Sequence, residues 1–193
     1  GVLGDLVDVD AEHARAVEVA LGEALQALVA HEDRGVTEAI GYLKNRSGRV
    51  GVLSLSDALS APGPAVDPEP MPGLRGALLD RVRPEADIAP LVARLLHNTF
   101  LVDDLQTALA LSRRYPAAYL RCVTPEGDAV DLFGLASGGK SEGEDGSVLG
   151  RRREIRTLRA VIAHQNARYA ALVPRLDAVA VRLQTLDRRL EAL

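Results

Sequence analysis

The chain has 193 residues, of which 47% are apolar and only 3% aromatic, and its net charge at pH 7 is −4. This length suffices for one domain with a hydrophobic core and an appendage, or for two small subdomains. No apolar run of about 20 residues predicts a membrane-spanning helix, and a single cysteine excludes both an internal disulfide and a Cys-x-x-Cys metal or redox motif.

The first 55 residues alternate between strand and helix patterns. In chain order, the predicted elements are a strand over 2–9, a helix over 11–23, a strand over 25–30, a helix that begins at Asp33 and a buried strand over 49–55. The spacing of Val36, Ile40 and Leu43 predicts the inner face of the second helix. This β-α-β-α-β order is typical of an α/β domain.

A proline-rich segment follows. Residues 61–73 contain five of the ten prolines, a density that neither a helix nor a central strand tolerates. We therefore predict a linker or surface loop at 61–73, between one subdomain over 1–60 and another over 74–150.

The second half begins a new series of elements. In chain order, it predicts a helix over 85–97, a strand over 99–102, a helix capped by Asp103 and ended by Pro116, and a hairpin of strands over 118–123 and 128–133. Leu105, Ala108 and Leu109 form the expected inner face of the second of these helices, and Cys122 is expected to be a core residue. A glycine-rich stretch comes next.

The pattern changes at Ile155. From there to Leu193, apolar residues recur at alternating spacings of three and four, a register that an ordinary surface helix would lose over this length. We predict a coiled-coil helix over 151–193 that needs a partner helix. Pro174 lies on its outer side and predicts a kink or a short break.

One motif resembles a phosphate-binding loop. The segment from Gly134 to Ser141 matches G-x-x-x-x-G-K-S and follows a predicted strand. However, three acidic residues and two glycines follow, whereas phosphate binding requires a helix that begins at the Lys-Ser pair. The glycines are better explained by a sheet edge where their missing side chains let another backbone approach.

The charge is unevenly distributed. Residues 1–146 contain 13 basic and 23 acidic residues, a net charge of −10, whereas residues 147–193 contain 10 basic and 4 acidic residues, a net charge of +6. The basic cluster at the start of the predicted coiled coil gives candidates for contacts with DNA phosphates: Arg151, Arg152, Arg153 and Arg156, with Lys140 nearby in the sequence. A solvated helix face would explain the same arginines.

Together, these segments resemble the hinge domain of SMC (structural maintenance of chromosomes) proteins over about residues 1–155. Three segments carry the resemblance: the run from Val123 to Asp128, the paired Gly138 and Gly139, and the run from Arg152 to Ile155 at the start of the predicted coiled coil. It implies a two-subdomain α/β module at the turn of a long antiparallel coiled coil, which forms a ring-shaped dimer through two sheet-edge contacts.

The resemblance also implies roles and partners. Gly134, Gly138 and Gly139 would lie at the dimer interface, and the arginine cluster would bind DNA weakly and without sequence preference. We expect a cytoplasmic, nucleoid-associated, bacterial homodimer that serves chromosome condensation and segregation. We expect neither enzyme activity nor a cofactor, since ATP hydrolysis belongs to the family's head domains. The apolar stripe of the coiled-coil helix, called the seam below, is expected to pair with a preceding coiled-coil helix of a longer chain.

Two other functions remain open at this stage. The chain could be a coiled-coil scaffold whose globular head binds a protein partner, or a nucleotide-binding domain that uses the Gly134–Ser141 segment.

Overall fold

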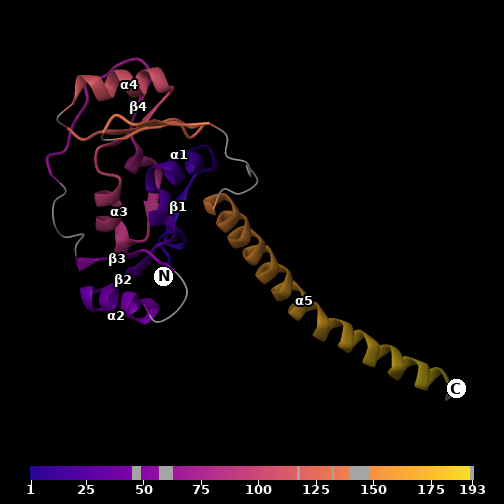
Figure 1. Cartoon of the computed structure of the whole chain (residues 1–193). Coiled ribbons are helices and arrows are strands. Elements are labelled where there is room, and N and C mark those ends of the chain that lie inside the picture. Colours follow the sequence, from indigo (N-terminus) through magenta and orange to yellow (C-terminus); the bar gives the residue numbers. More distant parts are fainter. Residues whose placement is uncertain (45–48, 57–62, 117, 132, 140–147, 192–193) are drawn as a thin grey trace. The chain divides into compact units, whose positions relative to one another are not determined.

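The computed structural model describes most of the chain (Figure 1): residues 1–44, 49–56, 63–116, 118–131, 133–139 and 148–191. They form two compact units, Gly1–Arg151 and Arg152–Leu193. No helix among these residues combines the length and apolar character needed to cross a membrane.

The helices and strands follow one another through the chain. The helices are α1 (Ala11–Leu21), α2 (Asp33–Lys44), α3 (Ala89–Leu95), α4 (Leu105–Arg114) and α5 (Val148–Glu191). The strands are β1 (Val7–Val9), β2 (Leu28–Ala30), β3 (Val52–Ser54), β4 (Leu74–Ala77), β5 (Val82–Pro84), β6 (Thr99–Val102), β7 (Arg121–Val123), β8 (Ala129–Val130) and β9 (Ala136–Ser137). Short 3-10 turns cover Leu3–Asp5, Gly22–Gln26, Leu78–Arg81 and Ala86–Ile88.

A mixed five-stranded sheet organises the first unit. Its order is β4-β6-β7-β8-β9, with β6 and β7 parallel and the other pairs antiparallel. Two small sheets accompany it, an antiparallel pair of β1 with β5 and a parallel pair of β2 with β3. The α/β class and the long C-terminal helix expected from the sequence are therefore confirmed.

The central sheet separates two hydrophobic clusters. All four residues of β6 are buried, and because side chains alternate along a strand, Phe100 and Val102 pack into one cluster while Leu101 packs into the other. Helix α4 covers the first of these faces (Figure 1), and helices α1 and α3 contribute to the second cluster. Burial on both faces explains why residues 100–102 of β6 form an unbroken apolar run in the sequence.

The two halves of the first unit share structure across the proline-rich segment. Strand β1 pairs with β5, and one cluster contains Leu3 and Val17 together with Leu91 and Val123. The division into subdomains 1–60 and 74–150 stays a prediction.

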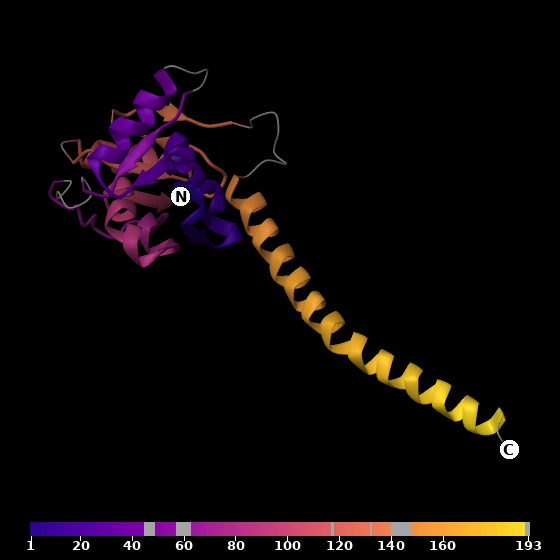
Figure 2. The same cartoon turned by 90° about the horizontal axis from the view of Figure 1, so that it is seen from below.

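The α2–β3 region is less buried than the sequence predicts. Helix α2 has no buried residue, and Ile40, expected on its inner face, is exposed. Val52 and Leu53 of β3 are only half-buried. The reason is that α2 packs on a sheet that has only two strands within the described residues, which offers little surface to cover a helix face (Figure 2).

The cap of α4 is one residue later than predicted. Asp104, not Asp103, is the N-cap, and its Oδ1 accepts a hydrogen bond from the Thr107 backbone N at 2.7 Å. This bond lowers the pKa of Asp104. Asp103 instead pairs with Arg75, whose Nε lies 2.5 Å from its Oδ1.

Cys122 is a core residue, as predicted. Its side chain is fully buried in the hydrophobic cluster beneath α4, and burial raises the pKa of the thiol to about 11. Because the thiolate is the reactive form, we expect native protein at pH 8 to resist alkylation by iodoacetamide and urea-unfolded protein to react. Rapid alkylation of the native chain, followed by mass spectrometry, would contradict this packing.

Helix α5 runs without interruption through Pro174, so a short break is wrong, whereas a kink there stays a prediction. A proline removes one backbone hydrogen bond, and the turns on both sides of it remain helical here. The seam positions described in this helix are exposed, among them Ile155, Leu158, Leu172 and Leu183.

The first turn of α5 is held by α1. The Glu18 Oε1 accepts a hydrogen bond from the backbone N of Leu149 at 2.7 Å, and the Leu149 side chain is buried in the core. A carboxylate at this position satisfies a free amide at the start of a helix and complements its dipole.

We expect Glu18→Ala to lower the free energy of unfolding by about 1 kcal/mol, the usual cost of losing a helix cap. Glu18→Gln should cost less, because its amide oxygen can accept the same bond. Urea unfolding followed by circular dichroism measures both, and equal effects of the two changes would rule out the capping role.

Candidate functional site

Strand β9 is the open edge of the central sheet. Both Ala136 and Ser137 are exposed, and β8 pairs with β9 on one side only within the described part of the chain. The Asp131 N donates to the Leu135 O at 3.0 Å, and Ala129 lies opposite Ser137. Since hydrogen-bonded and non-hydrogen-bonded pairs alternate in an antiparallel ladder, the amide and carbonyl of Ala136 point away from β8. Such an edge is ready to pair with another strand.

Two large apolar side chains precede this edge. Phe133 is 83% exposed and Leu135 is 67% exposed. Apolar side chains gathered on a surface are typical of interaction sites, whereas isolated ones need no explanation. Here the two lie beside a strand that has one open side, so one partner could cover both the side chains and the backbone.

The turn that leads into β9 is fixed by Asp131. Its Oδ1 accepts hydrogen bonds from the backbone N of Phe133 at 2.8 Å and of Leu135 at 2.9 Å. Gly134 between them has φ +79°, a conformation that favours glycine. Gly134 is therefore required by the turn itself, whatever else approaches it.

Gly138 and Gly139 follow β9 and face Asp128. A Cβ at Gly138 would lie 2.0 Å from the Asp128 Oδ1, so any other residue there would require the Asp128 side chain to move. The same Oδ1 accepts from the Gly139 N at 3.3 Å, and Gly139 has φ +104°. The structure thus gives each glycine a role within the chain, and their predicted role in the approach of a second backbone stays a prediction.

The phosphate-loop hypothesis does not fit the described part of its motif. Ala136 and Ser137 form a strand antiparallel to β8, whereas a phosphate loop connects a strand to a helix N-terminus. A carboxylate, that of Asp128, already accepts from the Gly139 amide and would repel phosphate. Lys140 and Ser141 lie outside the described residues.

The basic candidates lie on the first turns of α5. Arg151 and Arg156 are exposed, and Arg152 is half-buried. The side chain of Arg153 lies outside the description, as does Lys140. No group of His, Cys, Asp and Glu side chains suited to hold a metal ion occurs in the described ranges.

Sequence reasoning missed the side chains that build the edge. Asp128 and Asp131 belong to a predicted hairpin and look like ordinary turn residues. Phe133 and Leu135 could have been noticed, because one of only two phenylalanines in the chain stands in a glycine-rich stretch. That position is poorly suited to a core residue.

Comparisons with known proteins agree on one family. The family model of the SMC proteins flexible hinge domain matches residues 1–112. The chain is 35% identical over 178 residues to the chromosome partition protein Smc of Myxococcus xanthus, a match that covers 91% of this chain and 15% of that protein. It is 31% identical over 196 residues to the Smc of Desulfitobacterium hafniense, covering 99% of this chain and 16% of that protein. The chain therefore corresponds to a small part of these relatives.

Solved structures give the same result. An asymmetric dimer of the Geobacillus stearothermophilus SMC hinge domain matches with a TM-score of 0.73 and 28% identity, over 89% of this chain and 70% of that one. The hinge domain of the Pyrococcus furiosus SMC protein matches with a TM-score of 0.58 and 30% identity, over 72% of this chain and 71% of that one. The family model ends before β9, so the glycines of the edge lie outside its match.

The contact between Gly138 and Asp128 predicts a compensating pair of substitutions. Gly138→Ala should destabilise the β8–β9 hairpin, because its Cβ would clash with the carboxylate. Adding Asp128→Ala should recover part of that loss, since only the Asp128 Cβ, 3.3 Å away, would remain. Thermal unfolding of the two single variants and the double variant measures the coupling, and strictly additive losses would refute the proposed clash.

Proposed function

The chain belongs to the SMC hinge family, and on that premise we propose that it is the dimerisation module of a longer chromosome partition protein. The observation that carries the proposal is the open edge of β9 with Phe133 and Leu135 beside it. A second copy that supplies a strand would satisfy the outward amide and carbonyl of Ala136 and cover both apolar side chains.

We propose β3 of the second copy as the strand that pairs with β9. In the parallel pair of β2 and β3, the N-terminal segment runs along the side of β2 that faces away from β3, where the Leu3 N donates to the Ala27 O at 2.9 Å. This leaves the outer side of β3 as the open edge within the described part of this sheet. Leu28, Ile40 and Tyr42 are exposed on β2 and α2, which supplies apolar surface there.

Two unlike edges produce a closed dimer. If β9 of each copy pairs with β3 of the other, a two-fold axis generates the contact twice. Such a dimer has two separate contacts, as the ring expected from the sequence requires. Gly138, next to Ala136 on the same outward side, would let the second backbone approach.

The seam of α5 has a separate role in this proposal. Its exposed apolar stripe would pair with a preceding coiled-coil helix of the full-length protein, so that the hinge closes the end of a long coiled coil. Dimerisation through the hinge edge and pairing through the seam are then independent, and a nucleoid location would follow from the partition function.

Sedimentation equilibrium of the whole chain separates these two contacts. Ala136→Pro removes the outward amide and should convert the dimer to a monomer, because an edge strand tolerates proline only where no partner needs its N–H. Ala136→Thr keeps the amide and should remain dimeric, and Leu176→Asp in the seam should also leave the dimer intact. A dimer that survives Ala136→Pro but is lost in Leu176→Asp would assign association to the coiled coil, and a monomeric wild type would favour a scaffold head for another protein.

A second function, non-specific DNA binding, is favoured by the charge at the start of α5. Residues 151–159 contain five arginines and one acidic residue, whereas residues 1–146 are acidic. Arg151 and Arg156 are exposed and could contact phosphates without reading sequence.

We expect the double change Arg151→Glu and Arg156→Glu to weaken binding of duplex DNA by about tenfold or more and to flatten its salt dependence. Fluorescence anisotropy at two salt concentrations measures this. Arg34→Glu, an equal change of charge per site on α2, is the control and should have little effect. If the double variant and Arg34→Glu lost DNA binding to the same extent, a local site would be contradicted.

A further inference from the structure

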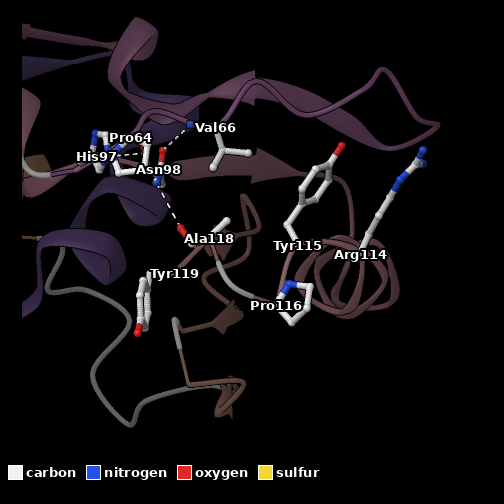
Figure 3. Close-up of a pocket in the computed structure, with 9 residues that line it drawn as sticks. All are labelled: Pro64, Val66, His97, Asn98, Arg114, Tyr115, Pro116, Ala118 and Tyr119. Carbon is white, nitrogen blue, oxygen red and sulfur yellow. Dashed lines mark hydrogen bonds between the residues drawn. The ribbon is translucent and has the colours of Figure 1, made fainter.

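A pocket of about 570 Å³ lies beside the C-terminal end of α4. Its walls come from the segment at Pro64 and Val66, the turn at His97 and Asn98, and residues 114–116, 118 and 119 at and after the end of α4 (Figure 3). Its volume is in the range of pockets that hold a small molecule or a side chain of a partner. None of its walls belongs to the β9 edge or to the basic cluster.

Asn98 fixes the walls of the pocket relative to one another. Its Oδ1 accepts from the Val66 N at 2.9 Å, and its Nδ2 donates to the Ala118 O at 3.1 Å and to the Pro64 O at 3.3 Å. One side chain thus ties three separate segments together (Figure 3). A pocket whose walls are already hydrogen-bonded loses little conformational freedom when it is filled.

The proline-rich segment is held at a second point. The Tyr115 hydroxyl accepts from the Glu69 N at 3.0 Å, and the Arg114 guanidinium pairs with the Glu69 carboxylate. Both interactions lie at the other end of the pocket from Asn98 (Figure 3). The segment therefore forms a fixed wall.

Two residues of the pocket adopt backbone conformations that are uncommon outside glycine. Asn98 has φ +50° and Tyr119 has φ +48°. Such conformations persist where the surroundings enforce them, and they cluster at sites that clamp ligands. At Tyr119 the result is an aromatic ring that is 69% exposed on the lining of an apolar pocket.

Arginines line the pocket and an adjoining groove although the domain is acidic, and the one in the pocket lining, Arg114, is paired with Glu69. The pocket lining contains no carboxylate, and neither does an adjoining groove of about 250 Å³ that shares Tyr119 and includes Phe133. That groove includes Arg113, an exposed guanidinium for which the described residues supply no ion pair. Residues 1–146 otherwise carry a net charge of −10.

We propose that this pocket docks a short segment of another protein in which an aromatic or large aliphatic side chain is flanked by acidic residues. The side chain would enter between Tyr115 and Tyr119, and an acidic neighbour would pair with Arg113. A peptide is favoured over nucleic acid because the site is a single pocket with one free cation among the described residues. A nucleic acid strand needs a continuous basic track, and the acidic domain would repel it.

The test uses the whole chain and a labelled nonapeptide with a central Phe between pairs of Asp. Two matched peptides replace either the Phe with Ser or every Asp with Lys, and labelled oligothymidine represents nucleic acid. By fluorescence anisotropy, the acidic aromatic peptide should bind about tenfold more tightly than either matched peptide.

Variants locate the binding. Tyr119→Ser and Arg113→Glu should each weaken binding of the acidic aromatic peptide by about tenfold, whereas Arg34→Glu on α2 should leave it unchanged. Equal binding of the three peptides, or insensitivity to Tyr119→Ser, would overturn the proposal. The proposal would also be overturned, in favour of a nucleic acid site, if oligothymidine bound more tightly than the acidic aromatic peptide and if Tyr119→Ser and Arg113→Glu both removed that binding.

Discussion

Burial of the central sheet on both faces is the constraint on which the rest of the first unit depends. A strand such as β6, with every residue buried, needs a helix layer on each side, so that α4 covers one face and the α1–α3 cluster covers the other. Once both faces are covered, the sheet can interact with other molecules only through its edges. Strand β9 is such an edge, and its exposure follows directly from this arrangement.

The edge is built for pairing by residues that act within the chain. Asp131 sets the turn before β9, and Asp128 receives the amide that follows it, so both ends of a two-residue strand are held by carboxylates. This explains how so short a strand keeps an extended backbone with the amide and carbonyl of Ala136 directed outward. The positive φ of Gly134 and Gly139 and the carboxylate beside Gly138 account for these glycines even in a single copy. Dimerisation would therefore use an edge that the monomer has already ordered.

The sequence was most informative where one element has one strong periodicity. The α/β class, the β7–β8 hairpin, strand β6 and the long helix were all predicted from apolar spacing and turn residues. Strands β4 and β5 were missed, because three or four residues that include Arg, Gly or Pro carry no alternation. The two residues of β9 are too few to show a pattern, although the glycines around them indicated a sheet edge. The burial of α2 was overestimated, since periodicity shows which face is apolar but not how much sheet lies beneath it. The roles of Asp128 and Asp131 could not be predicted, because they depend on contacts between the strand ends of a folded hairpin.

Hydrogen exchange of the β9 amides tests the central claim most directly. At concentrations where the whole chain is dimeric, the account predicts that the Ala136 amide exchanges slowly. Its exchange should become faster when the protein is diluted to the monomer. The Ser137 amide, which points toward β8, should exchange at a rate that depends far less on concentration. A dimer in which the Ala136 amide exchanges as fast as in the monomer would contradict pairing through this edge.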